Sequence, residues 1–372
     1  MDFVSNKIIM NKDKTKLLPW SEKYRPCTVK NIIYHKKITT SITNYMKKDN
    51  LPHLLFYGPP GTGKTTTILA VAKHYYKEDF DNMILVLNAS EERGIETVRN
   101  RIKQFVICKG LTQNNDTPSF KLIILDEIDA MTEDAQAILR KVIEKYVSNV
   151  RFCFICNYLK KINPAIQSRC VIFRFSPIPH KYMHDFILKI CDSEKIKITT
   201  NAINLIIKKT NGDMRKLLNI LQSMHMYLNN NVSNKSESDK IICESEKETN
   251  DDILEPNSYI IINELIVSKI LCCPTKKHII SFIGFIQENN IKDSYDYLNN
   301  LINKYGISLF ELITYTYEYC MDFIINNNNS VLKYSQSQVV NIIKNISSIN
   351  ENLTYCNNDS IHIISFLSIF YL

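Results

Sequence analysis

Short apolar runs alternate with segments of helical spacing over the first half of the chain. Each run holds four or five residues that are nearly all apolar, which is the pattern of a strand buried on both faces of a parallel sheet. The runs are Leu54–Tyr57, Met83–Leu87, Leu122–Leu125, Phe152–Cys156 and Val171–Phe175. We therefore expect an α/β domain over residues 18–176, with a parallel five-stranded sheet and helices on both of its faces.

Pro177 and Pro179 end this alternation, and the apolar residues then recur at intervals of three and four. That spacing predicts helices instead of strands. The clearest stripes lie at Phe186–Ile190, Ile203–Ile207 and Met214–Leu228. We expect one helical domain over residues 177–271 and a second over residues 272–372.

Two segments lack the apolar residues that a core needs. Residues 1–17 form a lysine-rich leader that we expect to be mobile, and residues 229–257 are rich in Asn, Ser, Glu and Lys and predict a disordered acidic insertion. Farther on, Ser308–Glu311 matches a capping box at the start of a helix. The terminal Ile361–Leu372 is apolar but short and interrupted by polar residues, so we interpret it as a buried last helix.

Glycine is scarce in this chain, yet three of its eight glycines fall between Gly58 and Gly63. With Lys64 and Thr65 they complete the pattern G-x-x-x-x-G-K-[ST], placed between a predicted strand and a predicted helix. In such a loop, backbone N–H groups and the positive end of the helix hold phosphate oxygens. Lys64 would then reach the β- and γ-phosphates of a nucleotide, and the Thr65 hydroxyl would bind Mg²⁺.

A second motif follows about sixty residues later. The apolar run Leu122–Leu125 ends directly in two carboxylates, Asp126 and Glu127, so a buried strand would deliver them to the end of the sheet. Asp126 suits a contact to Mg²⁺, directly or through water. Glu127 suits the base that orients and polarises an attacking water.

The positive net charge of the chain is compatible with a polyanionic partner. The formal net charge is +8, and residues 231–256 hold eight acids against three lysines, so the rest of the chain carries +13. The eleven cysteines are scattered, which is typical of a reduced intracellular protein. Cys153 and Cys156 lie within a predicted strand, so we do not expect a metal site there. We expect no membrane contact, because no apolar run approaches the roughly 18 residues of a membrane span.

Taken together, these motifs resemble the small subunits of replication factor C, the eukaryotic clamp loader among the AAA+ ATPases. The resemblance covers about residues 18–228, and beyond that only length and helical content agree. The blocks that carry it are Trp20–Pro26, the glycine-rich loop, Leu87–Ile95, Asp126–Glu127, Ala135–Arg140, Arg151–Tyr158, Gln167–Cys170 and Gly212–Arg215. Ser21 departs from the pattern, since a bulkier residue is usual at this position.

The resemblance implies an ATP site with Mg²⁺ as its metal. The implied catalytic residues are Lys64, Asp126, Glu127 and Asn157, where Asn157 positions water against the γ-phosphate. Thr65 and Asp126 would hold the metal. The nucleotide itself would be bound by Tyr24, Arg25, Pro26, Ile33, Gly58, Pro59, Pro60, Gly61, Thr62, Gly63, Lys64, Thr65, Thr66, Asn157 and Arg215, the last from a helical lid.

Two further roles follow from the resemblance. Arg169 matches an arginine finger, which would act in trans on the ATP of a neighbouring subunit. Arg93, Arg99, Lys103 and Arg140 match residues that follow the phosphates of DNA, and contacts of this kind carry no sequence information.

The function implied is that of an ATPase subunit in a heteropentamer with four homologous subunits. That complex opens a sliding clamp and loads it on primer–template DNA during replication and repair in the nucleus. The last domain, residues 272–372, would be the helical collar that joins the subunits.

Two other functions stay open at this point. One is an AAA+ protein remodeller, although such proteins present an aromatic and apolar loop to a central pore, whereas the corresponding segment 88–94 is polar. The other is a nucleotide-binding scaffold subunit whose ATP turnover is dispensable. All of the expected catalytic residues are present, so the sequence does not favour the scaffold.

Overall fold

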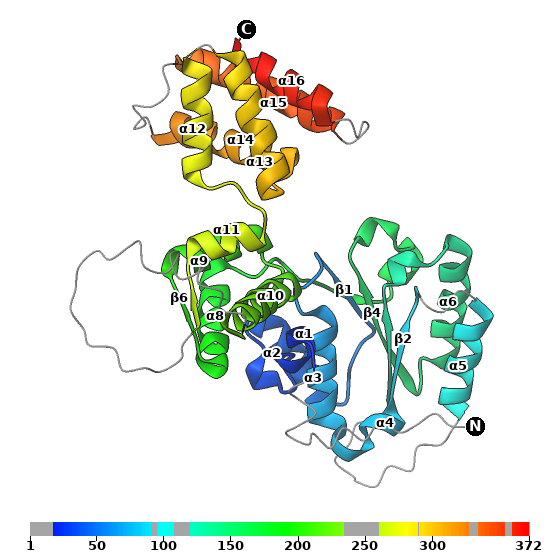
Figure 1. Cartoon of the computed structure of the whole chain (residues 1–372). Helices are drawn as coiled ribbons and strands as arrows, with labels where there is room; N and C mark the ends of the chain where they lie inside the picture. The colour runs from blue at the N-terminus through cyan, green and yellow to red at the C-terminus, as the bar shows by residue number, and fades with distance from the viewer. Residues whose placement is uncertain are drawn as a thin grey trace. The chain divides into compact units, whose positions relative to one another are not determined.

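The structure, a computed structural model, describes residues 18–90, 95–107, 120–233, 260–288, 290–326, 334–353 and 359–371. The chain divides into two compact units (Figure 1). The first holds residues 1–197 and 203–260, and the second holds residues 198–202 and 261–372. The predicted leader and the part of the predicted insertion from residue 234 onward lie outside the described residues.

A parallel sheet of five strands forms the centre of the first unit, as the apolar runs predict. Its strands are β1 (Leu54–Tyr57), β2 (Ile84–Asn88), β3 (Lys121–Asp126), β4 (Val150–Cys156) and β5 (Val171–Arg174). They lie in the order β2-β3-β4-β1-β5, and all four neighbouring pairs are parallel. Because the strands are parallel, the segments that leave β1, β3 and β4 emerge at one edge of the sheet.

Helices cover both faces of this sheet, which confirms the predicted layers (Figure 1). The helices are α2 (Lys36–Lys47) and α3 (Lys64–Tyr76) on one face, and α5 (Ile95–Ile107) and α6 (Glu133–Tyr146) on the other. Successive strand residues alternate between the two cores: Leu54 and Phe56 pack on the α3 side, and Leu55 packs on the α6 side. The two-sided burial explains why the strands read as continuous apolar runs.

Short elements complete the first unit and connect the strands. They are α1 (Trp20–Lys23), α4 (Phe80–Met83), α7 (Pro164–Gln167) and the 3-10 helices η2 (Val29–Asn31), η3 (Lys77–Asp79), η4 (Ile128–Ala130) and η5 (Leu159–Lys161).

The helical segment after the sheet contains the three predicted helices. They are α8 (His180–Glu194), α9 (Thr200–Thr210) and α10 (Met214–Ser233). Helix α10 continues past its predicted end at Leu228, so residues 229–233, which were predicted to belong to the disordered insertion, are helical. Two short strands, β6 (Ile196–Ile198) and β7 (Ile260–Ile262), form a second sheet.

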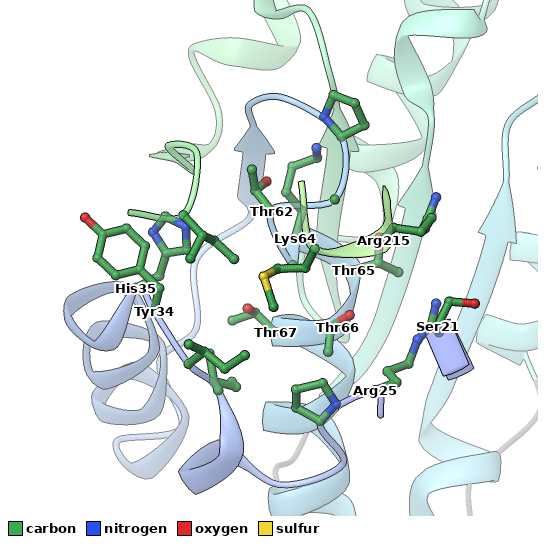
Figure 2. A pocket seen from close by; sticks show the side chains of 18 of the residues that line it. Ser21, Arg25, Tyr34, His35, Thr62, Lys64, Thr65, Thr66, Thr67 and Arg215 are labelled. Carbon is green, nitrogen blue, oxygen red and sulfur yellow. The ribbon is translucent and has the colours of Figure 1, made fainter. Parts of the chain in front are cut away.

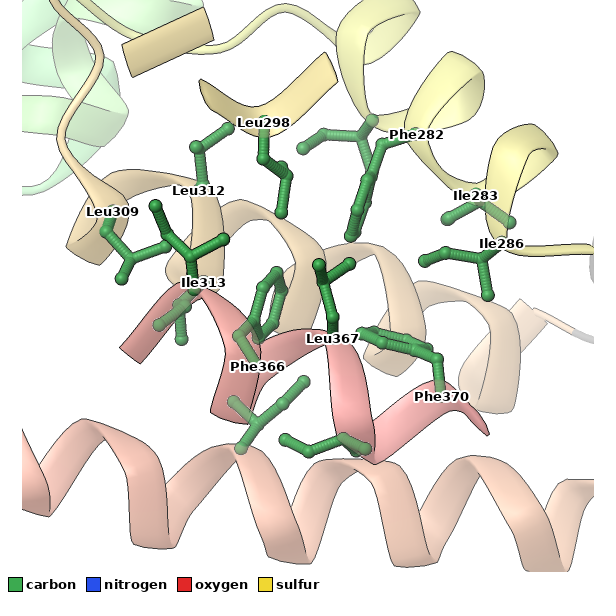
Figure 3. Packing of buried hydrophobic residues seen from close by; sticks show 14 of the residues in the cluster. Phe282, Ile283, Ile286, Leu298, Leu309, Leu312, Ile313, Phe366, Leu367 and Phe370 are labelled. Carbon is green, nitrogen blue, oxygen red and sulfur yellow. The ribbon is translucent and has the colours of Figure 1, made fainter. Parts of the chain in front are cut away.

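The second unit is helical throughout its described residues, apart from the short strand segments. Its helices are α11 (Glu264–Ile270), α12 (Lys276–Gln287), α13 (Ile291–Tyr305), α14 (Leu309–Asn326), α15 (Gln336–Asn352) and α16 (Asp359–Tyr371). Phe282 of α12 stacks on Phe366 of α16 at 5.7 Å, and Phe370 meets both rings edge-on (Figure 3). The terminal apolar segment is therefore a helix packed into a core, as predicted.

Before α14, the Ser308 hydroxyl accepts a hydrogen bond from the Glu311 N–H at 3.2 Å, which is one half of the predicted capping box. No helix among the described residues has the length and apolar character to cross a membrane.

The aromatic packing on the α6 side of the sheet leads to a first prediction. Phe154 is fully buried and stacks on Phe152 at 5.7 Å. Phe154→Ala should lower the free energy of unfolding of the first unit by about 3–5 kcal/mol, because it removes buried apolar surface and leaves a cavity. Denaturant unfolding followed by fluorescence of Trp20, the chain's only tryptophan, measures this unit directly.

Ile172→Ala is the matched control, since Ile172 lies on the edge strand β5 and is 40% exposed. Ile172→Ala should lower the free energy of unfolding by less than about 1 kcal/mol. Equal losses for the two variants would contradict the packing described for the sheet.

Candidate nucleotide-binding site

The glycine-rich loop connects β1 to α3 in a conformation that only glycine adopts readily. Gly58 has a φ of +148°, and a Cβ added there would lie 2.0 Å from the Phe175 carbonyl oxygen. Gly63, at the N-terminal cap of α3, has a φ of +90°. The loop thereby points its backbone toward the start of the helix, which is the geometry that binds phosphate.

The Lys64 side chain is buried at the centre of this loop. Its Nζ donates hydrogen bonds to the carbonyl oxygens of Gly58 at 2.8 Å and Pro59 at 2.9 Å, and to Oδ1 of Asn157 at 3.0 Å. Burial lowers the pKa of Lys64, and the nearby Asp126 carboxylate opposes that shift. An anion in this position would favour the charged form of the lysine.

The two predicted acids lie at the end of β3, beside the loop. Thr65 Oγ1 donates to Asp126 Oδ2 at 2.6 Å. Glu127 has a left-handed backbone, with φ of 55°, and its N–H donates to Asp126 Oδ1 at 2.9 Å. A hydroxyl and a carboxylate oxygen in contact are the hard ligands that Mg²⁺ prefers, so Thr65 and Asp126 fit the expected metal.

Asn157 follows β4 and reaches the same place from the neighbouring strand. Its backbone N–H donates to Asp129 Oδ2 at 3.1 Å, and the N–H of Tyr158 donates to the same oxygen at 3.2 Å. Asp129 therefore fixes the turn that presents the Asn157 amide to Lys64. Asp129 was not among the residues predicted from the sequence, although it stands in the acidic segment after β3.

The N-terminus of α10 closes directly on the glycine-rich loop. The Met214 N–H donates to the Gly61 carbonyl oxygen at 3.2 Å, and Asp213 Oδ1 accepts from the N–H groups of Arg215 and Lys216 at 2.8 and 3.0 Å. A Cβ added to Gly61 would lie 1.7 Å from Asp213 Oδ1. Gly61 is therefore required by its contact with Asp213 as well as by its φ of +68°.

A pocket of about 220 Å³ opens beside the loop (Figure 2). Most of the residues expected to bind ATP line it, namely Tyr24, Arg25, Pro26, Ile33, Pro60, Gly61, Thr62, Gly63, Lys64, Thr65, Thr66, Asn157 and Arg215, together with Asp126 and Glu127. Gly58 and Pro59 lie behind it and meet Lys64 through their carbonyl groups. Ser21 also lines the pocket despite its small size.

Three lining residues from the helical segment were missed by the sequence analysis. Phe186 lies on α8, and Met214 and Leu218 lie on α10. With Pro26 and Ile33 they make part of the pocket lining apolar, which suits the flat face of a nucleotide base. Their only sequence signal was the apolar stripe of a helix, which does not separate a pocket wall from a core.

Arg169 lies outside this pocket. Its Nη1 donates to the Ala165 carbonyl oxygen and its Nη2 to Glu144 Oε1, both at 2.7 Å. Arg140 Nε donates to the same Glu144 oxygen at 3.2 Å. One exposed carboxylate thus joins the expected arginine finger to an expected DNA contact.

The other expected DNA contacts fall on α5. Arg99 and Lys103 are both exposed there and lie four residues apart, so they share one side of the helix. Arg93 lies outside the described residues.

Three family models match this chain. The ATPase family associated with various cellular activities (AAA) matches residues 54–178, the RFC1-like AAA+ ATPase lid domain matches residues 181–236, and the Rad17 P-loop domain matches residues 10–93. The sheet and its loop thus lie in the AAA match, and most of α8 to α10 lies in the lid match.

Similar curated relatives are named as replication factor C subunits. Replication factor C subunit 5 of Homo sapiens is 50% identical over 214 residues, which cover 57% of this chain and 62% of that protein. Replication factor C subunit 3 of Saccharomyces cerevisiae is 38% identical over 315 residues, which cover 84% of this chain and 83% of that protein. The chain belongs to the replication factor C small subunits.

The resemblance of residues 152–158 and 165–175 predicts the subunit type numbered five in animals and three in yeast, and the names of these relatives confirm it. Probable replication factor C subunit 5 of Dictyostelium discoideum is 49% identical over 220 residues, 59% of this chain and 63% of that protein. The chain therefore spans less than two thirds of the length of the first relatives it matches.

The chain is also similar to solved structures. The RuvB Holliday junction branch migration motor of Thermotoga maritima has a TM-score of 0.48 and 17% identity, covering 77% of this chain and 88% of that one.

The contact between the loop and α10 yields a second prediction. Gly61→Ala and Gly63→Ala each place a side chain at positive φ, but only the first displaces Asp213 from the cap of α10. Gly61→Ala should therefore lower the free energy of unfolding by about 1 kcal/mol more than Gly63→Ala does, because a helix cap usually contributes about that much. Unfolding of the nucleotide-free chain, followed by Trp20 fluorescence, measures the difference.

A shorter residue at the cap of α10 tests whether the clash with Asp213 causes the extra loss of stability. In an Asp213→Ser background the extra cost of Gly61→Ala should shrink, because serine still caps the helix and leaves more room. An extra cost that persists unchanged in that background would contradict the proposed clash.

Proposed function

We propose that this chain is an ATP-binding and ATP-hydrolysing subunit of a heteropentameric clamp loader. Its partners would be four homologous subunits, a sliding clamp and primer–template DNA. Its work would be to open the clamp and load it on DNA during replication and repair, in the nucleus. The observation that carries the proposal is the convergence of Lys64, Asp126 and Asn157 on one pocket that the helical segment closes.

ATP with Mg²⁺ would supply the phosphoryl group and the charge that the site is built to hold. Lys64 already stands among acceptors that a phosphate oxygen could replace, since two of its three hydrogen bonds go to loop carbonyls. Thr65 and Asp126 would hold the metal, and Arg215 would approach from α10. Glu127 lines the pocket next to Asp126, and it would take the proton of the attacking water.

Arg169 supports a role in trans. Within this chain it is bound to Glu144 and to the Ala165 carbonyl group, and it does not line the pocket. A guanidinium supplied by a neighbouring subunit can raise the hydrolysis rate by about 10³–10⁵ in related NTPases. The site of this chain would depend in the same way on a neighbour, so the isolated subunit should hydrolyse ATP slowly.

The proposal predicts separate effects on binding and turnover in the reconstituted complex. Glu127→Gln should preserve ATP binding and slow hydrolysis at this subunit's site by about 10²–10⁴, because the general base is lost and the shape is kept. Clamp loading should fall with it. ATP affinity by equilibrium titration and clamp loading on primed DNA measure the two effects.

Glu133→Gln is the control, since Glu133 is an exposed acid in the first turn of α6 and does not line the pocket. It should leave both quantities unchanged. Full clamp loading by Glu127→Gln would favour a scaffold subunit whose turnover is dispensable.

The exposed basic residues of α5 lead to a prediction of how DNA binding by the complex depends on the salt concentration. Arg99→Ala combined with Lys103→Ala should weaken binding to primer–template DNA of any sequence. It should also reduce the slope of log K against log salt by about 0.9 for each phosphate contact that is removed. Fluorescence anisotropy titrations at several salt concentrations measure this slope.

Lys37→Ala with Lys47→Ala removes the same charge from α2, which covers the opposite face of the sheet. This control should leave the slope unchanged. An equal change in both variants would mean that the overall charge matters and that α5 makes no specific contact.

A further inference from the structure

The segment at the start of α1 contacts the helical segment that closes the pocket. Trp20 is buried, and its backbone N–H donates to Gln222 Oε1 on α10 at 2.9 Å. The Trp20 ring lies 5.2 Å from the ring of His225 on the same helix. The polypeptide that leads into the pocket wall is therefore docked on α10 before it reaches the nucleotide-binding residues.

A polar cluster fixes the other end of this segment to α8. Glu194, in the last turn of α8, accepts hydrogen bonds from Lys23 Nζ and from the Tyr24 hydroxyl. The Tyr24 hydroxyl also lies 2.9 Å from Ser193 Oγ. Only 15% of the Glu194 side chain is exposed, so these bonds are partly shielded from water.

The charges in the cluster are matched. Burial alone would raise the pKa of Glu194, but the hydrogen bonds from Lys23 and Tyr24 outweigh it and the pKa is lowered. The hydrogen bond to Glu194 raises the pKa of Lys23. The carboxylate and the ammonium are therefore both charged at neutral pH, and each stabilises the charged form of the other.

This cluster joins two walls of the same pocket. One wall consists of Tyr24, Arg25 and Pro26, and the other includes Phe186, Met214 and Leu218 from α8 and α10. A base bound between them needs both walls at the right separation. Glu194 contacts the first wall from α8, the helix that also carries Phe186 of the second wall.

We propose that Glu194 is a positioning residue that holds the lid against the Trp20–Pro26 segment and thereby sets the affinity of the pocket for ATP. The proposal rests on the proposed ATP-binding function. Without the Glu194 bonds, the two walls would be correctly placed for a smaller fraction of the time. The apparent dissociation constant rises in proportion as the binding-competent fraction falls.

The test compares three variants of the full chain. Glu194→Gln keeps the size of the side chain and removes its charge, and Tyr24→Phe removes only the hydroxyl. Asp192→Asn is the matched control, since it neutralises an exposed acid two residues away on α8. ATP affinity is measured by calorimetric titration in the presence of Mg²⁺, and the docking of the segment by the emission of Trp20 without nucleotide.

Glu194→Gln should weaken ATP binding about three- to tenfold, which corresponds to about 1 kcal/mol, because glutamine keeps an acceptor oxygen but loses the charge that strengthens these hydrogen bonds. The Trp20 emission should shift to longer wavelength, because the indole becomes more exposed. Tyr24→Phe should weaken binding alone but add little in the Glu194→Gln background, since both changes break the same contact. Asp192→Asn should match the unaltered chain in both measurements.

The assembled complex supplies a readout that a general loss of stability would not give. Glu194→Gln should raise the KM for ATP at this subunit's site and leave kcat nearly unchanged, because saturating ATP restores the closed arrangement. Glu194→Asp should recover part of the affinity.

Two results would overturn the inference. One is a Glu194→Gln chain with unchanged ATP affinity and unchanged Trp20 emission while the unaltered chain binds ATP. The other is an equal loss in Asp192→Asn. If the unaltered chain does not bind ATP but Glu194→Gln still shifts the Trp20 emission, the proposed function fails, and the cluster is then a structural contact alone.

Discussion

The arrangement of the site depends on one buried cation. Lys64 places an ammonium group where water is largely excluded, and such a group is costly unless it is paired or hydrogen-bonded. Here the carbonyl groups of Gly58 and Pro59 and the amide of Asn157 satisfy its three donors. These bonds join the loop after β1 to the turn after β4, so one side chain sets the relative position of two segments far apart in the sequence.

The order of the strands makes this possible. β4 lies between β3 and β1, and all three are parallel, so their carboxyl ends bring Asp126, Asn157 and the loop to one edge. Asp129 then reaches back from the segment after β3 to hold the Asn157 turn. The site is thus a consequence of topology first, with a few side chains that adjust adjacent turns.

The parts of the site that could be predicted from the sequence are those encoded by a short, continuous stretch of residues. The strands are apolar on both faces, and the glycine-rich loop has a fixed spacing, so both could be predicted with their boundaries nearly right. Asp129, Phe186 and Glu194 could not be assigned, because their roles depend on which segment folds against them. An acid in a turn, an aromatic in a helical stripe and an acid at a helix end have many possible partners, and only tertiary packing selects one.

The sheet and the helical segment from α8 to α10 contribute to the nucleotide site in different ways. The sheet is held by apolar cores on both faces. The helical segment contacts the loop through the Met214 N–H, and it contacts the α1 segment through Glu194 and through the Trp20 ring. Elements held by few apolar contacts open at lower free energy than a core. We therefore expect the helical segment to move more readily than the edge of the sheet when a ligand binds. Such a site would couple the occupancy of the pocket to movement while the residues at the sheet edge keep their positions.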